Sequence, residues 1–139
     1  MRALWRDPQF ALAILLPLIG WLFLVVAGKP QTSIRDPLFL LNQVVLIPLI
    51  EELVFRGWLQ GRLLRHTRCQ ARWAGISCAN ALVAGLFAIA HVFTHPPLWA
   101  AATIVPALVF GYFRERHHSV LPAIVLHVYY NGGYFLLFA

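Results

Sequence analysis

The stretch Ile50-Glu51-Glu52-Leu53-Val54-Phe55-Arg56 places two adjacent carboxylates and an arginine inside an apolar run that extends from about Pro37 to Gln60. The whole chain holds only five acidic residues, and two of them lie here. A charged side chain at the centre of a bilayer costs at least ~2.5–3.5 kcal/mol, so such residues are rare and are functional by default. The stretch therefore predicts a membrane helix that carries a functional site.

The composition supports an integral membrane protein. Of the 139 residues, 60% are hydrophobic and 12% are charged, whereas soluble domains average about 25% charged residues. The net charge of +6 comes from basic residues that lie between apolar segments, which is typical of membrane topology and argues against a nucleic-acid partner. We predict a single membrane domain over residues 1–139, located in a prokaryotic-type plasma membrane, although an endomembrane fits the composition and charge asymmetry equally well.

The apolar segments predict an all-α helical bundle with about five transmembrane helices. The expected spans are approximately 10–27, 38–60, 73–93, 98–113 and 120–139. Lysine and arginine are concentrated in the segments that would be cytoplasmic if the N-terminus is inside, about eight against the two outside, Lys29 and Arg35. The positive-inside rule therefore predicts that the N-terminus is in the cytoplasm and the C-terminus is outside.

The acidic pair divides into two roles by helical geometry. Residues at i and i+4 share a helix face, whereas adjacent residues diverge by about 100°. Glu52 and Arg56 are therefore placed to form an ion pair, and an arginine in lipid requires such a partner. This spacing gives Glu52 and Arg56 a structural role and leaves Glu51 as the candidate for chemistry.

Two later helices each carry a polar edge. The third expected helix has one stripe of small, polar and aromatic residues at helical spacing, which should face the bundle interior: Ser77, Asn80, Ala84, Phe87 and His91. The fifth has His127, Asn131 and Tyr134 on one face. A carboxylate that acts as general base, with histidines and an amide that stabilise a developing oxyanion, is a set suited to hydrolysis.

These residues resemble the signature of a known family. Glu51-Glu52-x-x-x-Arg56, Phe87-x-x-x-His91 and His127-x-x-x-Asn131 are similar to the three motifs of the CPBP (CAAX protease and bacteriocin-processing) intramembrane proteases, also called Abi or Rce1-like. The resemblance covers roughly residues 40 to 133. It implies a catalytic core at about 38–139, preceded by a leading anchor helix at about 9–28. Family members commonly have about eight spans, so this chain is short for the family.

The resemblance implies a glutamic-type intramembrane endopeptidase that needs no cofactor. Glu51 would activate the attacking water with help from His91, and His127 with Asn131 would stabilise the oxyanion. Glu52 and Arg56 would hold the second helix, and Phe87 would pack beside His91. The implied partners are the lipid bilayer and a membrane-anchored protein or peptide substrate, cut near its terminus. A prenylated protein, a bacteriocin leader and a sorting tag remain open as substrates.

Three other functions fit parts of the pattern. A zinc metalloprotease would use Glu51, His91 and His127 as metal ligands with an open fourth position, although no H-E-x-x-H motif is present. A small b-type cytochrome would use His91 and His127 as axial haem ligands, but it would leave the acidic pair and Asn131 unexplained. A binding or immunity protein on the same fold would lack catalysis, and its activity would survive loss of Glu51.

Overall fold

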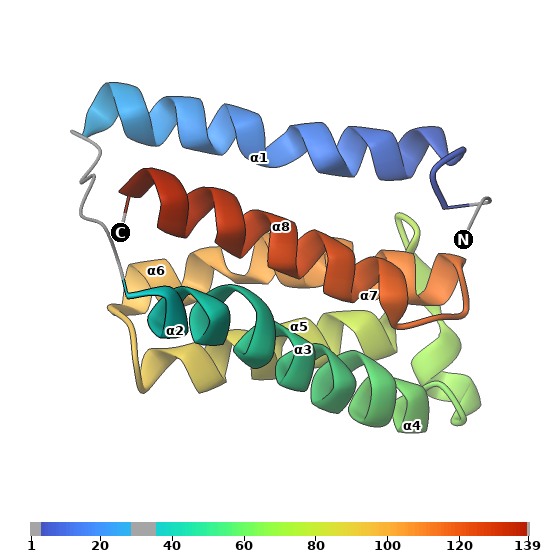
Figure 1. Ribbon diagram of the computed structural model, residues 1–139. Helices are drawn as coiled ribbons and strands as arrows, with labels where there is room; N and C mark the ends of the chain where they lie inside the picture. The colour runs from blue at the N-terminus through green and yellow to red at the C-terminus, as the bar shows by residue number, and fades with distance from the viewer. Residues whose placement is uncertain (1–3, 29–35, 139) are drawn as a thin grey trace. The chain divides into compact units, whose positions relative to one another are not determined.

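The computed structural model describes residues 4–28 and 36–138 and is built almost entirely of helices (Figure 1). Four helices are long and apolar enough to cross a membrane, namely Pro8–Ala27, Pro37–Leu63, Pro97–Arg116 and Leu121–Phe138. A fifth, Cys78–Val92, is apolar but only 15 residues long. The prediction of an all-α helical membrane protein is confirmed, while the orientation stays a prediction. Lys29 and Arg35, which contributed to that orientation, lie outside the described residues.

The chain divides into two compact units. One unit comprises residues 1–50 and 124–139, and the other comprises residues 51–123. Each unit is described by itself below, and the expectation of a single domain stays a prediction.

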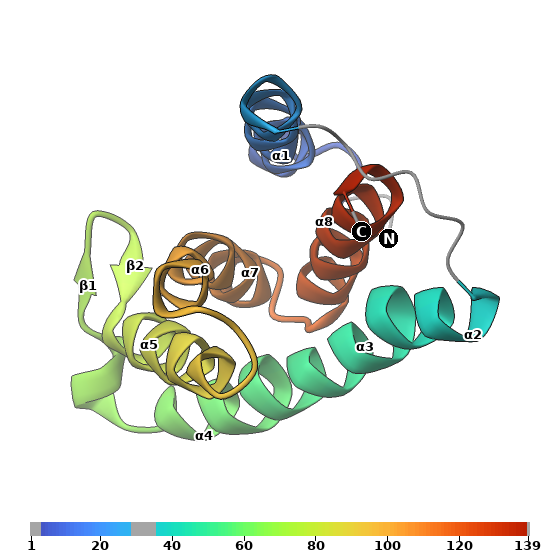
Figure 2. The ribbon, with the colours of Figure 1, turned by 90° about the vertical axis from the view of Figure 1, so that its left-hand side faces the viewer.

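In the unit of residues 51–123, a helical run leads into a small hairpin and then into three further helices (Figure 2). The elements are the end of α3 (Ile47–Glu52), η2 (Leu53–Gln60), α4 (Gly61–Leu63), η3 (Thr67–Gln70), β1 (Arg72–Trp73), β2 (Ile76–Ser77), α5 (Cys78–Val92), α6 (Pro97–Ala102) and α7 (Ile104–Arg116). Helix α5 packs against both η2 and α7. Its core contains Ala84, Phe87 and Ala107, with Phe55 and Leu108 packed against them.

The other unit contains α1 (Pro8–Ala27), α2 (Pro37–Leu40), η1 (Leu41–Leu46), the first part of α3 and most of α8 (Leu121–Phe138). Helix α1 begins with Asp7 as N-cap, whose carboxylate accepts a hydrogen bond from the Gln9 backbone N–H at 3.0 Å. Capping by Asp and a proline in the first turn are both typical of helix starts. The Tyr130 hydroxyl donates to the Ala13 carbonyl at 2.7 Å and joins α8 to α1.

The helical run Pro37–Leu63 is interrupted by two π-helical stretches. They are η1 and η2, and the α-helical turn between them, α3, carries both Glu51 and Glu52. π-Helical turns are rare and occur frequently at functional sites, because the wider turn changes where the side chains and carbonyls point. The acidic pair therefore lies in the regular segment between two local changes of helical register.

Two expected spans were wrong in their bounds. The third, expected at 73–93, begins only at Cys78, because residues 72–77 form the antiparallel hairpin β1–β2. Its turn residues Ala74 and Gly75 have φ values of 49° and 85°, and two positive-φ residues between paired strands are typical of a tight hairpin turn. The fourth, expected at 98–113, is divided into α6 and α7 and continues to Arg116.

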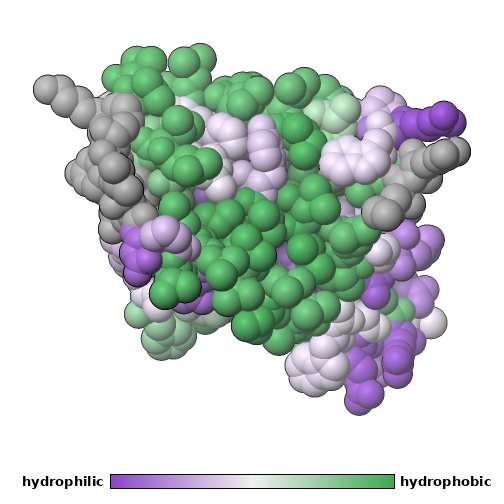
Figure 3. Space-filling view, in the orientation of Figure 1, coloured by the Kyte–Doolittle hydropathy of each residue, from purple (hydrophilic) through white to green (hydrophobic). Residues whose placement is uncertain are grey.

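The surface of the helices is apolar, as a lipid environment requires. Figure 3 shows hydrophobic side chains over the middle of the visible face and hydrophilic ones toward its two sides, including the region of α4. On α1, large aliphatic side chains such as Ile19, Leu22 and Val26 are exposed. In water such a surface would be an aggregation liability, whereas in a bilayer these side chains contact lipid.

Gly111 of α7 is required for close packing against α5. A Cβ at this position would overlap the side-chain amide of Asn80, which is buried and donates to the Leu108 carbonyl at 2.9 Å. We expect Gly111→Ala to lower the free energy of unfolding by about 1–3 kcal/mol, as overpacked sites do, despite the better helix propensity of alanine. Thermal unfolding in detergent measures this change.

Gly85→Ala on α5 is the matched control for Gly111→Ala, because a Cβ at Gly85 meets no atom within 4 Å. There the gain in helix propensity of up to about 1 kcal/mol is unopposed. Equal unfolding temperatures for the two variants would contradict the packing role of Gly111.

Candidate functional site

Glu52 and Arg56 form the ion pair that the i, i+4 spacing predicts. Arg56 Nη1 lies 2.9 Å from Glu52 Oε1, and both side chains have 0% exposure. Because a buried charge without a partner is very unfavourable, each group holds the other in the apolar interior. Glu51, one residue earlier on the same helix, is partly exposed. The two adjacent carboxylates therefore have different environments.

Arg56 links the helix of the acidic pair to two other helices. Its Nη2 donates to the Ala107 carbonyl of α7 at 3.1 Å. Its guanidinium lies 4.6 Å from the ring centroid of Phe87 on α5 and 5.6 Å from that of Phe110 on α7. A guanidinium over an aromatic face gains electrostatic attraction from the ring, more so when both are desolvated. Arg56 thus fixes the helix that carries Glu51 against α5 and α7.

Phe87 lies between Arg56 and His91. The Phe87 and His91 ring centroids are 4.4 Å apart, and His91 Nδ1 lies 2.8 Å from the Phe87 carbonyl oxygen. A carbonyl oxygen can only accept, so this contact assigns the proton to Nδ1. In the neutral imidazole, Nε2 then carries the lone pair and can accept a hydrogen bond. The His95 ring follows at 5.5 Å from that of His91.

The polar and aromatic stripe on the third expected helix was predicted to face the interior, and its first four residues are indeed buried. Ser77, Asn80, Ala84 and Phe87 are each at most 2% exposed, and His91, at the end of the stripe, is partly exposed. Ser77 is also the N-cap of α5, where its side chain accepts from the Asn80 backbone N–H at 2.9 Å.

His127 and Asn131 lie one turn apart on α8, in the unit of residues 1–50 and 124–139. His127 is 5% exposed, and Asn131 is partly exposed. Asn131 Nδ2 donates to the Gln43 carbonyl at 3.1 Å, within the π-helical stretch η1. An amide nitrogen has two N–H groups, so one of them joins two helices and the second remains for another acceptor.

The candidate site residues therefore fall into two separate sets in the structure. Glu52, Arg56, Phe87 and His91 form one connected set, with Glu51 beside it in sequence. His127 and Asn131 form the second set, in the other unit. That the two sets meet around one substrate stays a prediction. Within the described part of the 51–123 unit, no three His, Cys, Asp or Glu side chains group as a metal site.

Glu115 is a buried carboxylate with several side-chain partners, and the sequence did not lead us to expect it in the interior. It is 6% exposed, and its Oε1 accepts from Gln60 Nε2 at 2.7 Å and from the Ser77 hydroxyl. Its Oε2 pairs with Arg72 Nη2. Gln60, itself fully buried, also donates to the Gly111 carbonyl at 3.1 Å. Glu115 thus joins η2, the hairpin and α7 in one polar network.

A signal for Glu115 was present in the sequence. Counting back from it by four residues gives Gly111 and then Ala107, which lie on the buried face of α7. Because residues at i and i+4 share a face, extending that face by one turn places Glu115 in the interior. The expected end of this helix at residue 113 hid the pattern.

The comparisons with known proteins agree with the motifs. A family model described as Type II CAAX prenyl endopeptidase Rce1-like matches residues 33–133. The chain belongs to this family. The matched segment contains the acidic pair, Arg56, both histidine motifs and Asn131, and α1 precedes it. Searches of curated proteins and of solved structures gave no match.

Membership of the Rce1-like family makes this chain a CAAX-protease-like intramembrane endopeptidase in general terms. With four apolar helices of spanning length, it is a multi-pass integral membrane protein. The suspected resemblance to the CPBP family is confirmed by the match.

Proposed function

We propose that the protein hydrolyses a peptide bond near the membrane-anchored end of its substrate by glutamate-dependent catalysis. Glu51 takes a proton from a water molecule while the water oxygen attacks the scissile carbonyl carbon. The protonated Glu51 then delivers that proton to the leaving amine as the C–N bond breaks. General acid–base catalysis of this kind contributes typically 10²–10⁴-fold to a rate.

The observation that carries this proposal is the buried Glu52–Arg56 ion pair. Its 2.9 Å contact commits Glu52 to Arg56, because the buried guanidinium would otherwise be left without a compensating charge. Glu51 is the adjacent carboxylate, and it is partly exposed. Of the two, Glu51 is therefore the better candidate for proton transfer.

His91 fits the role of an assistant to Glu51. Its Nδ1–H is engaged by the Phe87 carbonyl at 2.8 Å, which fixes the ring and leaves Nε2 to contact water. The Phe87 ring in turn packs under the Arg56 guanidinium. The same contacts that hold the second helix thus also orient His91, which gives Phe87 and Arg56 a positioning role.

His127 and Asn131 are proposed to stabilise the oxyanion of the tetrahedral intermediate. The second N–H of the Asn131 amide and a ring N–H of His127 are donors of the type that oxyanion sites use. The hydrogen bond from Asn131 to Gln43 O would hold the amide in place, so the donor needs little reorganisation during the reaction.

The substrate is proposed to be a protein or peptide held in the membrane close to the cleaved bond. The family description names a prenyl endopeptidase, so a peptide with a prenylated cysteine near its C-terminus is the first substrate to test. The same peptide without the prenyl group shows whether membrane anchoring is required. A prokaryotic-type plasma membrane remains our proposed location.

We expect Asn131→Ala to lower kcat by roughly 10²-fold or more with a smaller effect on KM, because an oxyanion donor acts mainly in the transition state. Release of the C-terminal fragment from the prenylated peptide, followed by mass spectrometry, measures both constants. Asn42→Ala is the control, since Asn42 is exposed on the same helical run as Gln43.

Asn131→Ala also removes the hydrogen bond to Gln43 O, so its unfolding temperature is measured beside kcat. A lower unfolding temperature with an unchanged kcat would assign Asn131 to helix packing alone and remove its oxyanion role.

A further inference from the structure

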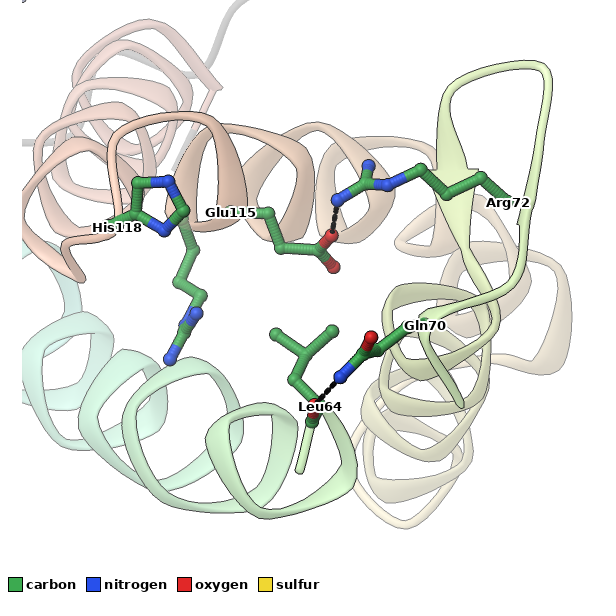
Figure 4. Close-up of a pocket in the computed structure, with 6 residues that line it drawn as sticks. Leu64, Gln70, Arg72, Glu115 and His118 are labelled. Atoms are coloured by element: carbon green, nitrogen blue, oxygen red, sulfur yellow. Dashed lines mark hydrogen bonds and ion pairs between the residues drawn. The ribbon is translucent and has the colours of Figure 1, made fainter. Parts of the chain in front are cut away.

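A polar pocket of about 380 Å³ lies where α4, the hairpin and α7 meet (Figure 4). It is lined by Leu64, Gln70, Arg72, Arg114, Glu115 and His118. Pockets for small ligands typically have volumes of about 300–1,000 Å³, so this one has room for a single small group. All six lining residues belong to the 51–123 unit.

The charges in this pocket favour an anion. Its single carboxylate, Glu115, is already engaged by Arg72, Gln60 and Ser77. Arg114 is the second cation, and among the described residues it makes no ion pair. Its Nε donates to the Arg56 carbonyl at 3.1 Å, which anchors the guanidinium and leaves its terminal nitrogens as donors.

His118 adds a third basic group on the other side of Glu115 from Arg72 (Figure 4). It follows the end of α7 with φ of 50°, and the Ser119 backbone N–H donates to the Arg114 carbonyl at 3.2 Å. A left-handed residue with such hydrogen bonds is a common helix C-terminal motif. The position of His118 is therefore set by the backbone and does not depend on a ligand.

The pocket lies in the most basic part of the described chain. Four further exposed arginines are close to its lining residues in sequence, namely Arg62, Arg65, Arg68 and Arg116. By the positive-inside rule this end of the helices faces the cytoplasm, where membranes expose anionic lipids that basic pockets between helices bind. Arginine recognises phosphate oxygens through directed pairs of N–H groups.

We propose that this pocket binds the phosphate of an anionic phospholipid headgroup. Arg114 and His118 contact the phosphate, and Leu64 faces the apolar part of the lipid. Arg72, although paired with Glu115, adds positive charge beside the phosphate. The inference is independent of the proposed catalytic mechanism, because it rests on binding groups that touch none of the proposed catalytic side chains.

Binding at this site should stabilise the helix of the acidic pair. Arg114 holds the Arg56 carbonyl, and Glu115 holds Gln60 on the same helix. A ligand that binds only the folded state raises stability according to its concentration and affinity. The unfolding temperature is therefore a readout that needs no substrate.

The experiment compares charge changes inside and outside the pocket. Wild type, His118→Asp and Arg116→Asp are reconstituted in phosphatidylcholine nanodiscs with and without phosphatidylglycerol, and the unfolding temperature and retained lipid are measured, the latter by native mass spectrometry. Aspartate tolerates the left-handed conformation at residue 118. Arg116 is exposed and lies outside the pocket, and Arg116→Asp removes at least as much positive charge.

We expect phosphatidylglycerol to raise the unfolding temperature of wild type and Arg116→Asp, and to have little effect on His118→Asp. The apparent affinity of His118→Asp should fall about tenfold or more, the usual scale for losing a charge-assisted hydrogen bond and gaining repulsion. Arg114→Gln should show the same loss, with Arg116→Gln as its control.

A second arm separates the two sources of phosphate. Inorganic phosphate is added to protein in phosphatidylcholine alone. One outcome is that inorganic phosphate stabilises wild type as strongly as phosphatidylglycerol does, without stabilising His118→Asp. That result would show that the pocket binds phosphate supplied from solution and would overturn the lipid headgroup as its source. Equal responses of His118→Asp and Arg116→Asp to phosphatidylglycerol, or no stabilisation of wild type by either probe, would overturn the proposal.

Discussion

We expect Glu51→Gln to lower kcat for peptide-bond cleavage by roughly 10²–10⁴-fold while the protein still inserts and folds. Glutamine has nearly the shape of glutamate, but its amide cannot take the proton of the attacking water. Because the buried contact to Arg56 is made by Glu52, the change at Glu51 leaves that ion pair intact. Fragment release from the prenylated peptide, measured beside the unfolding temperature, tests both parts.

The matched control for this experiment is Asp36→Asn. Asp36 is an exposed carboxylate that caps α2 by accepting from the Leu38 backbone N–H at 3.0 Å, so its loss changes charge without entering the proposed site. Cleavage by Glu51→Gln at the wild-type rate would remove Glu51 from the mechanism. A wild type that does not cleave, with a biological activity that survives Glu51→Gln, would instead favour a binding or immunity protein.

Measuring the metal content and the absorption spectrum of wild type and Glu51→Gln tests two alternative functions, the zinc metalloprotease and the b-type cytochrome. Stoichiometric zinc in wild type that is lost in the variant would make Glu51 a metal ligand, together with His91 and His127. Iron with a haem absorption band would instead indicate the cytochrome. A metal-free wild type that cleaves the peptide is the result expected of the glutamic mechanism.

Glu52→Gln should have its largest effect on stability. The change leaves the buried Arg56 without its compensating charge, and breaking a buried ion pair in this way typically costs about 3–5 kcal/mol. Arg56 has 0% exposure and also contacts Ala107 O and the Phe87 ring, so it cannot reach water without disturbing α5 and α7. We expect a much lower unfolding temperature and a lower yield of folded protein.

A double-mutant cycle separates the ion pair from other effects of these substitutions. Removing both charges in Glu52→Gln/Arg56→Gln should destabilise the protein less than the sum of the two single variants, because no charge is left buried alone. Glu51→Gln is the adjacent control with little expected loss of stability. Additive effects of the two single changes would contradict an energetic role for the pair.

Local spacing predicted the parts of the structure that depend on a single helix. The Glu52–Arg56 contact follows from an i, i+4 relation, and the burial of Ser77, Asn80, Ala84 and Phe87 follows from a shared helix face. Both are set by 3.6 residues per turn and need no knowledge of neighbouring helices. The choice of Glu51 over Glu52 as the catalytic carboxylate rests on the same spacing and stays a prediction.

Contacts between distant segments could not be predicted in this way. Glu115 meets Arg72, which is 43 positions away, only because the hairpin brings β1 beside the end of α7. The hairpin itself was hidden by the apolar residues Ile76 and Trp73, which fit a membrane helix equally well by hydropathy. Which helices pack together, and so which polar groups meet, depends on side-chain shapes that periodicity does not encode.

The shortness of α5 has a consequence for the solvent that hydrolysis consumes. A helix of 15 residues rises only about 22 Å, whereas the hydrocarbon layer of a bilayer is about 30 Å thick. Such a hydrophobic mismatch is relieved by local thinning of the bilayer around the helix. His91 lies in the last turn of α5, so we expect local thinning of this kind to bring the aqueous phase closer to this histidine than the depth of an ordinary span would allow.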